Sequence, residues 1–327
     1  MKKILSIDGG GIKGAFPAAF LAELEEQLGE PIVSYFDLIV GTSTGGIIAL
    51  GLGMGFSAKE ITTFYEKYGP NIFQPKNQGI MAKVARKVTT GYSDMLFDTK
   101  YDAKALKVAL YGLFGDRIIG DSQVRLVIPS FNIQSGTVRI YKTRHHPRFE
   151  LDWKKSVVEA ALATAAAPLY FQTFRTESGV PLIDGGVYAN NPVGLAAVEA
   201  IGVLKWQPEE LRILSLGCTE EPLDINLEKE HLGAADWKQG LIEVFMRSQS
   251  SSSYGIATLL ADNHIHNNVY KINPTTPPKL YSLDGVNRIG LLKALADETA
   301  RYEIAELRKR GFFAERAEPF IPIPLQS

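Results

Sequence analysis

The residues best suited to chemistry in this sequence are Gly41-x-Ser43-x-Gly45, which lie between two apolar segments. Leu38 to Val40 is typical of a buried strand, and Ile47 to Leu50 is compatible with a buried helix. A serine on a tight strand-to-helix turn needs glycines beside it, because larger side chains block the close passage of the chain. Such a turn exposes the hydroxyl and directs the first N–H groups of the helix toward it. The spacing therefore predicts a nucleophile at Ser43. The pentapeptide is a weak signal by itself, so the prediction depends on the other motifs of the chain.

A second glycine-rich loop, Asp8 to Gly14, follows a predicted strand over Lys3 to Ile7. A helix is predicted next, over Ala15 to Leu28, with Gly29 as its end. Strand, helix and strand then form a βαβ unit with parallel strands, so both glycine loops emerge at the carboxyl edge of the sheet. We expect the two loops to face each other there.

The spacing Gly9-x-Gly11-x-x-Gly14 also matches the fingerprint of dinucleotide-binding proteins. That fold requires an acidic residue at the end of the second strand, where this chain has Gly41 instead. A phosphate-binding P-loop does not fit either, because Lys13 is followed by glycine rather than Ser or Thr. We favour a row of backbone N–H donors aimed at an oxyanion. A nucleotide-binding module without catalytic activity remains the alternative.

An acid in a comparable position is Asp184, which ends the apolar run Leu182-Ile183 and is followed by Gly185 and Gly186. A carboxylate at the carboxyl edge of a sheet lies where α/β proteins bind ligands. Taken alone, the same residues are equally typical of an ordinary Asp-Gly turn.

A serine hydrolase usually has a histidine as its base, and the chain contains five histidines. The order Ser43, Asp184, then His264 or His266 is that of an α/β-hydrolase triad. However, the nucleophile turn follows only the second strand, and the two histidines fit surface or capping positions. A Ser-His-Asp esterase of small esters therefore remains an alternative.

The composition of the chain limits the possible ligands and the cellular compartment. The chain has 327 residues, a formal net charge of −1 and one cysteine, Cys218, to which we assign no role. This charge gives no attraction to nucleic acid, and one cysteine allows no internal disulfide, which suits a reducing compartment. No secretory signal follows Lys3, and the uncharged segment from Leu38 to Ala58 is rich in glycine and fits a buried strand and helix better than a membrane span. We expect a soluble, cytoplasmic protein, and no residue spacing indicates a metal site.

Several further elements follow from the patterns. We expect a helix over Leu241 to Asp262 with a break at Ser250 to Ser253, and a solvated basic loop over Arg144 to Arg148. Apolar residues at helical spacing between Met81 and Val88 predict a surface helix, or a basic amphipathic flap near lipid. The absence of a convincing linker predicts one domain over residues 1–327, with the motifs in about 3–217 and a helical part over about 236–327.

Four motifs in this order closely resemble those of the patatin-like phospholipases. They are the Asp8 to Gly14 loop, Gly41 to Gly45, Ala165 to Phe171, and Asp184 to Pro192. The resemblance implies a three-layer α/β fold, with a mainly parallel central sheet flanked by helices. It also implies a Ser43–Asp184 catalytic dyad without histidine. The oxyanion hole would be formed by Gly9, Gly10, Gly11 and Thr44, and the supporting motif residues would be Lys13, Gly14, Gly41, Gly45, Gly185 and Gly186. Relatives commonly have arginine where this chain has Lys13, so a bidentate role is in question there.

The resemblance further implies hydrolysis of carboxylic esters of membrane glycerophospholipids, without a cofactor. Among members of that family, the sequence looks most similar to the compact bacterial enzymes, some of which are anti-phage effectors that a cyclic nucleotide activates. A cyclic nucleotide is accordingly a candidate activator, and assembly of a homo-oligomer on activation is a candidate step. Action would take place at the inner face of the membrane, through peripheral contact.

Overall fold

The computed structural model describes residues 1–76, 99–223 and 234–324. In this part of the chain the centre is an eight-stranded sheet with the order β5-β6-β3-β2-β1-β7-β8, and β4 pairs with β3. The strands that pair in parallel are β1 (Lys2–Ile7), β2 (Leu38–Gly41), β3 (Arg125–Asn132), β7 (Leu211–Leu216) and β8 (Val269–Ile272). Antiparallel pairing adds β4 (Thr137–Lys142), β5 (Phe174–Arg175) and β6 (Pro181–Asp184) beside β3.

The opening βαβ unit forms as predicted. Strand β1 pairs in parallel with β2, with Ile4 opposite Leu38, and α1 (Ala15–Leu28) connects them. Gly29 ends this helix with a left-handed φ of 71°, a conformation that glycine adopts without a steric penalty. Both glycine loops consequently leave the sheet at its carboxyl edge.

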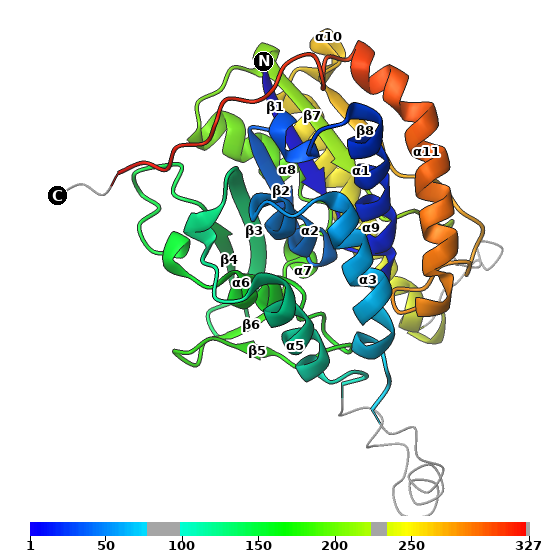
Figure 1. Ribbon diagram of the computed structural model, residues 1–327. Helices are drawn as coiled ribbons and strands as arrows, with labels where there is room; N and C mark the ends of the chain where they lie inside the picture. The colour runs from blue at the N-terminus through cyan, green and yellow to red at the C-terminus, as the bar shows by residue number, and fades with distance from the viewer. Residues whose placement is uncertain (77–98, 224–233, 325–327) are drawn as a thin grey trace, which may run out of the picture.

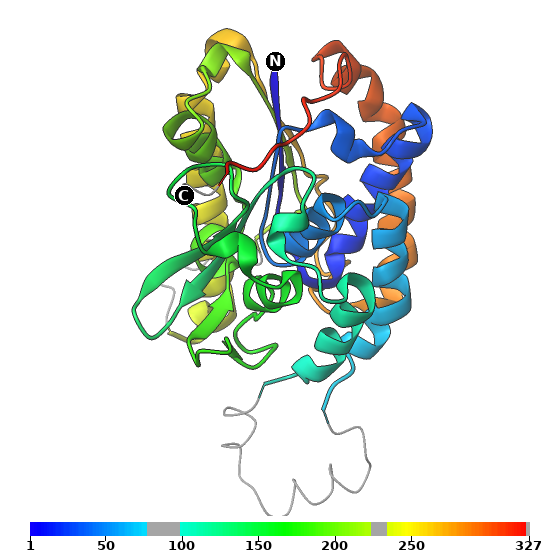
Figure 2. The same ribbon diagram turned by 60° about the vertical axis from the view of Figure 1, so that its left-hand side comes forward.

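Helices cover both faces of the sheet, as Figures 1 and 2 show. Alternation along β1 directs Leu5 and Ile7 to the larger core and Ile4 to the smaller one. The larger core packs against α1, α2 (Thr44–Gly53), α3 (Ala58–Ile72), α5 (Ala103–Phe114), α6 (Val157–Thr164) and α11 (Ile289–Lys309). The smaller core packs against α8 (Val193–Val198) and α9 (Ala234–Leu260), and two short helices are α7 (Gly186–Ala189) and α10 (Asn263–His266). This arrangement confirms the α/β prediction of a central sheet flanked by helices.

The predicted break in the helix at Ser250 to Ser253 is wrong, because α9 runs through it. The Ser253 hydroxyl donates to the carbonyl of Asn191 at 2.6 Å and accepts from the N–H of Gly194 at 2.9 Å. A side chain added at Gly194 would meet the backbone of Ser253 at 2.8 Å. The small polar residues therefore allow α9 to pack closely against the turn before α8.

The loop from Arg144 to Arg148 is likewise not solvated throughout. His145 is buried, and its Nε2 lies 2.9 Å from Oε1 of Glu199, whose other oxygen accepts from Lys142 at 2.6 Å. Desolvation lowers the pKa of His145, although Glu199 opposes this. The sequence pattern missed the role of this loop because its partner Glu199 is 54 positions away.

Strand β8 was not predicted, because Val269–Ile272 is only four residues long and has no clear alternation. The uncharged segment from Leu38 to Ala58 forms β2 and α2, which are buried within the protein. None of the helices in the described residues has the length and apolar character required to cross a membrane. The segment from Met81 to Val88, predicted as a surface helix or flap, lies outside the described residues.

Candidate active site

Ser43 occupies the turn between β2 and α2 in a strained backbone conformation, with φ 55° and ψ −121°. This conformation is rare for a residue with a side chain, and strained backbone of this kind is often found at functional sites. The neighbouring glycines are required by close approach. A Cβ at Gly41 would lie 2.2 Å from the carbonyl oxygen of Gly45, and one at Gly45 would lie 2.3 Å from that of Ile7. The backbone N–H of Ser43 is fixed by Thr164, whose Oγ1 accepts from it at 3.0 Å.

Asp184 meets the serine from the end of β6. The Ser43 hydroxyl donates to Oδ2 of Asp184 at 2.6 Å, across 141 positions of sequence. The other carboxylate oxygen accepts from the N–H of Gly186, also at 2.6 Å. Gly185 permits this turn because a Cβ there would lie 2.2 Å from the carbonyl oxygen of Pro129. The carboxylate is therefore held toward the serine by a backbone bond on its far side.

The environment of Asp184 tunes it toward accepting a proton. Burial raises the pKa of Asp184 to about 6, while the hydrogen bonds from Ser43 and Gly186 act in the opposite direction. An aspartate with its ordinary pKa of about 4 is a weak base near neutral pH, so this shift strengthens it as a base. It also leaves the carboxylate ionised at neutral pH.

The first glycine loop lies directly beside this pair. A Cβ at Gly9 would lie 3.2 Å from that of Ser43. The N–H of Gly9 donates to the carbonyl of Asn190 at 2.9 Å. The prediction that Gly9 contributes a free donor to the oxyanion hole is therefore wrong for its N–H group. Among the described residues no acceptor takes the N–H of Gly10 or the N–H of Gly11, which leaves these two groups as available donors of the loop.

Cys218 packs against Gly10. A Cβ at Gly10 would lie 2.5 Å from the Cβ of Cys218, whose thiol donates to the carbonyl of Asp8 at 3.3 Å. Across the loop, Gly14 makes room for Thr44, because a Cβ there would lie 2.0 Å from the Thr44 Oγ1. The N–H of Thr44 is at the start of α2, where helix N–H groups lack an intrahelical partner. The loop thus fits tightly against the turn that carries the serine.

A cavity of about 1200 Å³ opens in front of the serine and the aspartate. One part of it is apolar and runs between α3 and the segment after α6. The side chains that line this apolar arm include Ile12, Ile47, Phe64, Ile72, Phe73 and Phe171. Its character suits a hydrocarbon chain, since apolar ligands bind where water is excluded.

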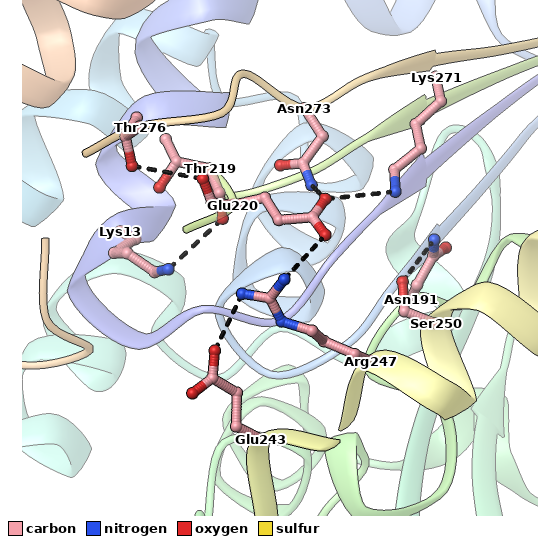
Figure 3. Close-up of polar contacts among 10 residues, drawn as sticks. All are labelled: Lys13, Asn191, Thr219, Glu220, Glu243, Arg247, Ser250, Lys271, Asn273 and Thr276. Carbon is pink, nitrogen blue, oxygen red and sulfur yellow. Dashed lines mark hydrogen bonds and ion pairs between the residues drawn. The ribbon is translucent and has the colours of Figure 1, made fainter. Parts of the chain in front are cut away.

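The other part of the cavity is polar and charged (Figure 3). Glu220 lies at its centre and accepts from Asn273 at 3.0 Å and from Arg247 at 3.5 Å, with Lys271 at 3.9 Å. Lys13 reaches only the carbonyl of Thr219, at 3.5 Å, and has no carboxylate partner among the described residues. As far as the described residues show, Lys13 is therefore a cation of this polar arm that no ion pair neutralises.

Histidine is absent from the described lining of this cavity. His264 and His266 lie in α10, which directly precedes β8 and so occupies the amino edge of the sheet, beside the start of β1 (Figure 1). Both candidates for a triad are thus at the edge opposite Ser43. The described residues also contain no cluster of three or more histidine, cysteine or acidic side chains that could hold a metal.

A serine in a strained turn, an adjacent carboxylate and a cavity at the carboxyl edge of an α/β sheet are features of a hydrolase site. Comparison with known proteins gives the family: residues 5–197 match the family described as patatin-like phospholipase. The chain therefore belongs to the patatin-like phospholipases and is a hydrolase.

Two relatives and one solved structure illustrate the similarity. The chain is 35% identical to a Pseudomonas aeruginosa protein named cGAMP-activated phospholipase, over 90% of this chain and 85% of that protein. An Escherichia coli protein of the same name is 28% identical, over 97% of this chain and 94% of its own length. Among solved structures, VipD from Legionella pneumophila aligns with 90% of this chain and 67% of its own, at a TM-score of 0.44 and 14% identity.

Proposed function

We propose that this protein is a phospholipase A-type enzyme that cleaves carboxylic esters of membrane glycerophospholipids through Ser43 and Asp184. The observation that carries the proposal is the 2.6 Å bond from the Ser43 hydroxyl to a buried carboxylate inside a partly apolar cavity. As the Ser43 oxygen attacks the ester carbonyl carbon, its proton passes to Oδ2 of Asp184. The negative charge that develops on the carbonyl oxygen is stabilised by the N–H of Gly10, with Gly11 and Thr44 as neighbouring donors.

The second half of the reaction uses the same two residues. Collapse of the tetrahedral intermediate breaks the ester bond, and Asp184 returns its proton to the departing alkoxide of the lysophospholipid. A water molecule then gives a proton to Asp184 and attacks the acyl group on Ser43. The fatty acid leaves, and the serine recovers its proton.

The two arms of the cavity support a phospholipid as the substrate. An acyl chain fits the apolar arm, and the phosphodiester of the headgroup fits the polar arm near Lys13. The ammonium group of Lys13 would act as a single point charge, since lysine lacks the planar fork of arginine. Replacement of Lys13 by methionine is expected to raise KM for phospholipids more than KM for an uncharged short-chain ester.

The alternative of a Ser-His-Asp esterase is less well supported, because the distance between α10 and Ser43 leaves His264 and His266 without access to the serine. A nucleotide-binding module that uses residues Gly9 to Gly14 is also less well supported. In that loop the Gly9 N–H is occupied by Asn190, and the loop packs against Ser43 rather than an open phosphate site.

We further propose that a cyclic nucleotide activates this enzyme and that it acts as an anti-phage effector at the inner face of the bacterial membrane, as one domain over residues 1–327. Support comes from the relatives named cGAMP-activated phospholipase, which align along most of the chain. Assembly of a homo-oligomer on activation would be part of this proposal.

The test is to incubate the purified protein with mixed phospholipid vesicles, with and without cGAMP, and to identify released fatty acids by mass spectrometry. We expect release that requires Ser43 and increases with cGAMP. Release that persists in Ser43→Ala would contradict the proposed nucleophile. Release that does not change with cGAMP or other cyclic dinucleotides would remove the proposed activation while leaving the hydrolase intact.

A further inference from the structure

Leu169 occupies a turn position that normally suits glycine. The turn runs from Ala167 to Tyr170 and is closed by a bond from the N–H of Tyr170 to the carbonyl of Ala167, at 3.1 Å. Pro168 is its second residue and Leu169 its third, with a positive φ of 72°. Proline followed by a residue with positive φ is the pattern of a type II turn, in which glycine or asparagine is preferred third. A leucine here strains the backbone.

Packing within the folded chain does little to offset the strain at Leu169. Its side chain is 69% exposed, so burial in the core does not explain it. Leu169 lies at the mouth of the cavity in front of Ser43. A strained, solvent-exposed apolar residue beside the entrance to a site is better explained by a contact outside the chain.

Other exposed apolar side chains continue this mouth. On one side, the N–H of Lys100 donates to the carbonyl of Leu169 at 3.0 Å, and the Lys100 side chain pairs with Asp284, next to the exposed Leu283. Leu283 also lines the cavity, and its carbonyl accepts from Ile12 at 2.8 Å. The exposed rim therefore passes from Leu169 to Leu283.

On the other side, β6 ends beside the residue that precedes this turn, because the N–H of Asp184 donates to the carbonyl of Ala166 at 3.0 Å. The exposed Val187 and Tyr188 follow in α7, and Val187 also lines the cavity. Gln249 of α9 donates to the carbonyl of Val187 at 3.2 Å, and Phe245, one helical turn earlier, is 65% exposed. We call these five residues the apolar rim: Leu169, Val187, Tyr188, Phe245 and Leu283.

We propose that the apolar rim is the surface that contacts a phospholipid bilayer, with Leu169 inserted among the acyl chains. This inference rests on the proposed phospholipase function and identifies the face that engages the lipid. Three residues of the rim, Leu169, Val187 and Leu283, also line the cavity that contains Ser43, so an acyl chain that leaves the bilayer at the rim would enter this cavity. Exposed apolar surface beside a binding cavity commonly marks such contacts.

The charges on the rim indicate how it binds. The two ion pairs beside it, Lys100 with Asp284 and Arg247 with Glu243, each sum to zero. Binding should therefore depend on apolar insertion rather than on attraction to anionic lipid, and it should change little with salt. A second copy of this chain is the rival occupant of the same surface.

The test compares two exposed leucines in a Ser43→Ala background, so that hydrolysis does not consume the vesicles. Leu169→Asn removes the apolar side chain and supplies a residue that tolerates positive φ. The matched control is Leu259→Asn, because Leu259 is 74% exposed and lies near the end of α9 that adjoins α10, at the opposite edge of the sheet. Binding is measured by cosedimentation with phosphatidylcholine vesicles at 0.05 and 0.5 M salt.

We expect Leu169→Asn to weaken vesicle binding about tenfold, as removal of one inserted leucine predicts, and Leu259→Asn to change it less than about twofold. The midpoint of thermal unfolding should not fall in Leu169→Asn, because the turn strain is relieved. Equal binding by the two variants, or binding that is lost at high salt, would overturn the proposal. So would loss of a dimer, measured by light scattering, with unchanged vesicle binding.

The design separates this inference from the enzymatic proposal. If the Ser43→Ala protein binds vesicles through Leu169 while the wild-type protein releases no fatty acid, the phospholipase proposal fails and the rim remains a lipid-binding surface. If the wild-type protein releases fatty acid but Leu169→Asn does not weaken vesicle binding, the rim proposal fails and the phospholipase proposal stands.

Discussion

Asp8 directly follows β1, Asp184 is the last residue of β6 in the same sheet, and both line the same cavity, yet their surroundings differ. Both side chains are buried to the same degree, with 6% and 5% of their surface exposed. Asp184 accepts two hydrogen bonds of 2.6 Å, whereas Oδ1 of Asp8 is buried without a partner in the described residues. Burial raises the pKa of Asp8 well above its ordinary value, with Glu220 adding to the shift and Lys271 opposing it.

The two acids differ in their hydrogen bonds more than in their burial. Burial disfavours the charged form of a carboxylate and raises its pKa, as at Asp8. At Asp184 two donors oppose that effect and leave the pKa at about 6, where the group is ionised at neutral pH but still basic. Of these two acids, only Asp184 is prepared to exchange a proton with the serine.

The largest expected effect is loss of hydrolysis when the dyad is broken. Asp184→Asn should lower kcat by about 10³- to 10⁴-fold, and Ser43→Ala by at least as much, because general base and nucleophile are then missing. Asp8→Asn is the matched control, since Asp8 lines the same cavity and its buried Oδ1 has no hydrogen-bond partner in the described residues, and the kcat of this variant should stay within about threefold of the wild type. Fatty acid release is the assay, and a loss in Asp8→Asn equal to that in Asp184→Asn would contradict the comparison.

The loop after Asp8 should contribute through its backbone. Gly10→Ala is expected to lower kcat by about 10²- to 10³-fold, because the added methyl group meets Cys218 at 2.5 Å and displaces the oxyanion donor. The double variant with Cys218→Gly should recover part of this loss by making room. Circular dichroism controls for folding, and wild-type kcat in Gly10→Ala would exclude this loop from the oxyanion hole.

The pH dependence of the rate should report a single base. Since burial raises the pKa of Asp184 to about 6, kcat/KM is expected to fall tenfold per pH unit below pH 6 and to level off above it. The profile is measured with a short-chain ester between pH 4.5 and 8.5. Variants His264→Ala and His266→Ala should show the same profile, and a collapse of rate in either one would support a histidine base instead.

A smaller effect is expected on stability. The folded-state pKa of Asp184 lies above its unfolded value, so ionisation of this group destabilises the fold as the pH rises through the range from about 4 to 6. Asp184→Asn removes this charge, and its thermal midpoint should exceed that of the wild type by a few degrees at pH 8 but not at pH 4. Scanning calorimetry at both pH values checks this, and a lower midpoint at pH 8 would mean that the ionised carboxylate stabilises the fold.

Much of the fold and of the site could be anticipated from local patterns. The βαβ opening and the Ser43 turn follow from apolar periodicity and glycine spacing, which are local properties of the sequence. The approach of Asp184 to Ser43 was expected from the resemblance of four motifs, and its catalytic role remains a prediction. One domain over the whole chain likewise remains a prediction.

What the sequence did not reveal depends on contacts between distant segments. The buried pair of His145 and Glu199, and the serines by which α9 packs against α8, each require a partner more than 50 positions away. The occupied N–H of Gly9 and the Oδ1 of Asp8, which has no partner among the described residues, also become visible only in three dimensions. The strain at Leu169 arises from a positive φ that leucine rarely adopts. Residue preferences therefore predict a different backbone conformation at this position.

The central claim, that Asp184 activates Ser43 without a histidine, can be tested by covalent labelling. A fluorophosphonate reacts with an activated serine, and digestion followed by mass spectrometry locates the adduct. We expect a label on the peptide containing Ser43 in the wild type and in the double variant His264→Ala/His266→Ala, and almost none in Asp184→Asn. Full labelling of Ser43 in Asp184→Asn, or its loss when the two histidines are replaced, would contradict the account.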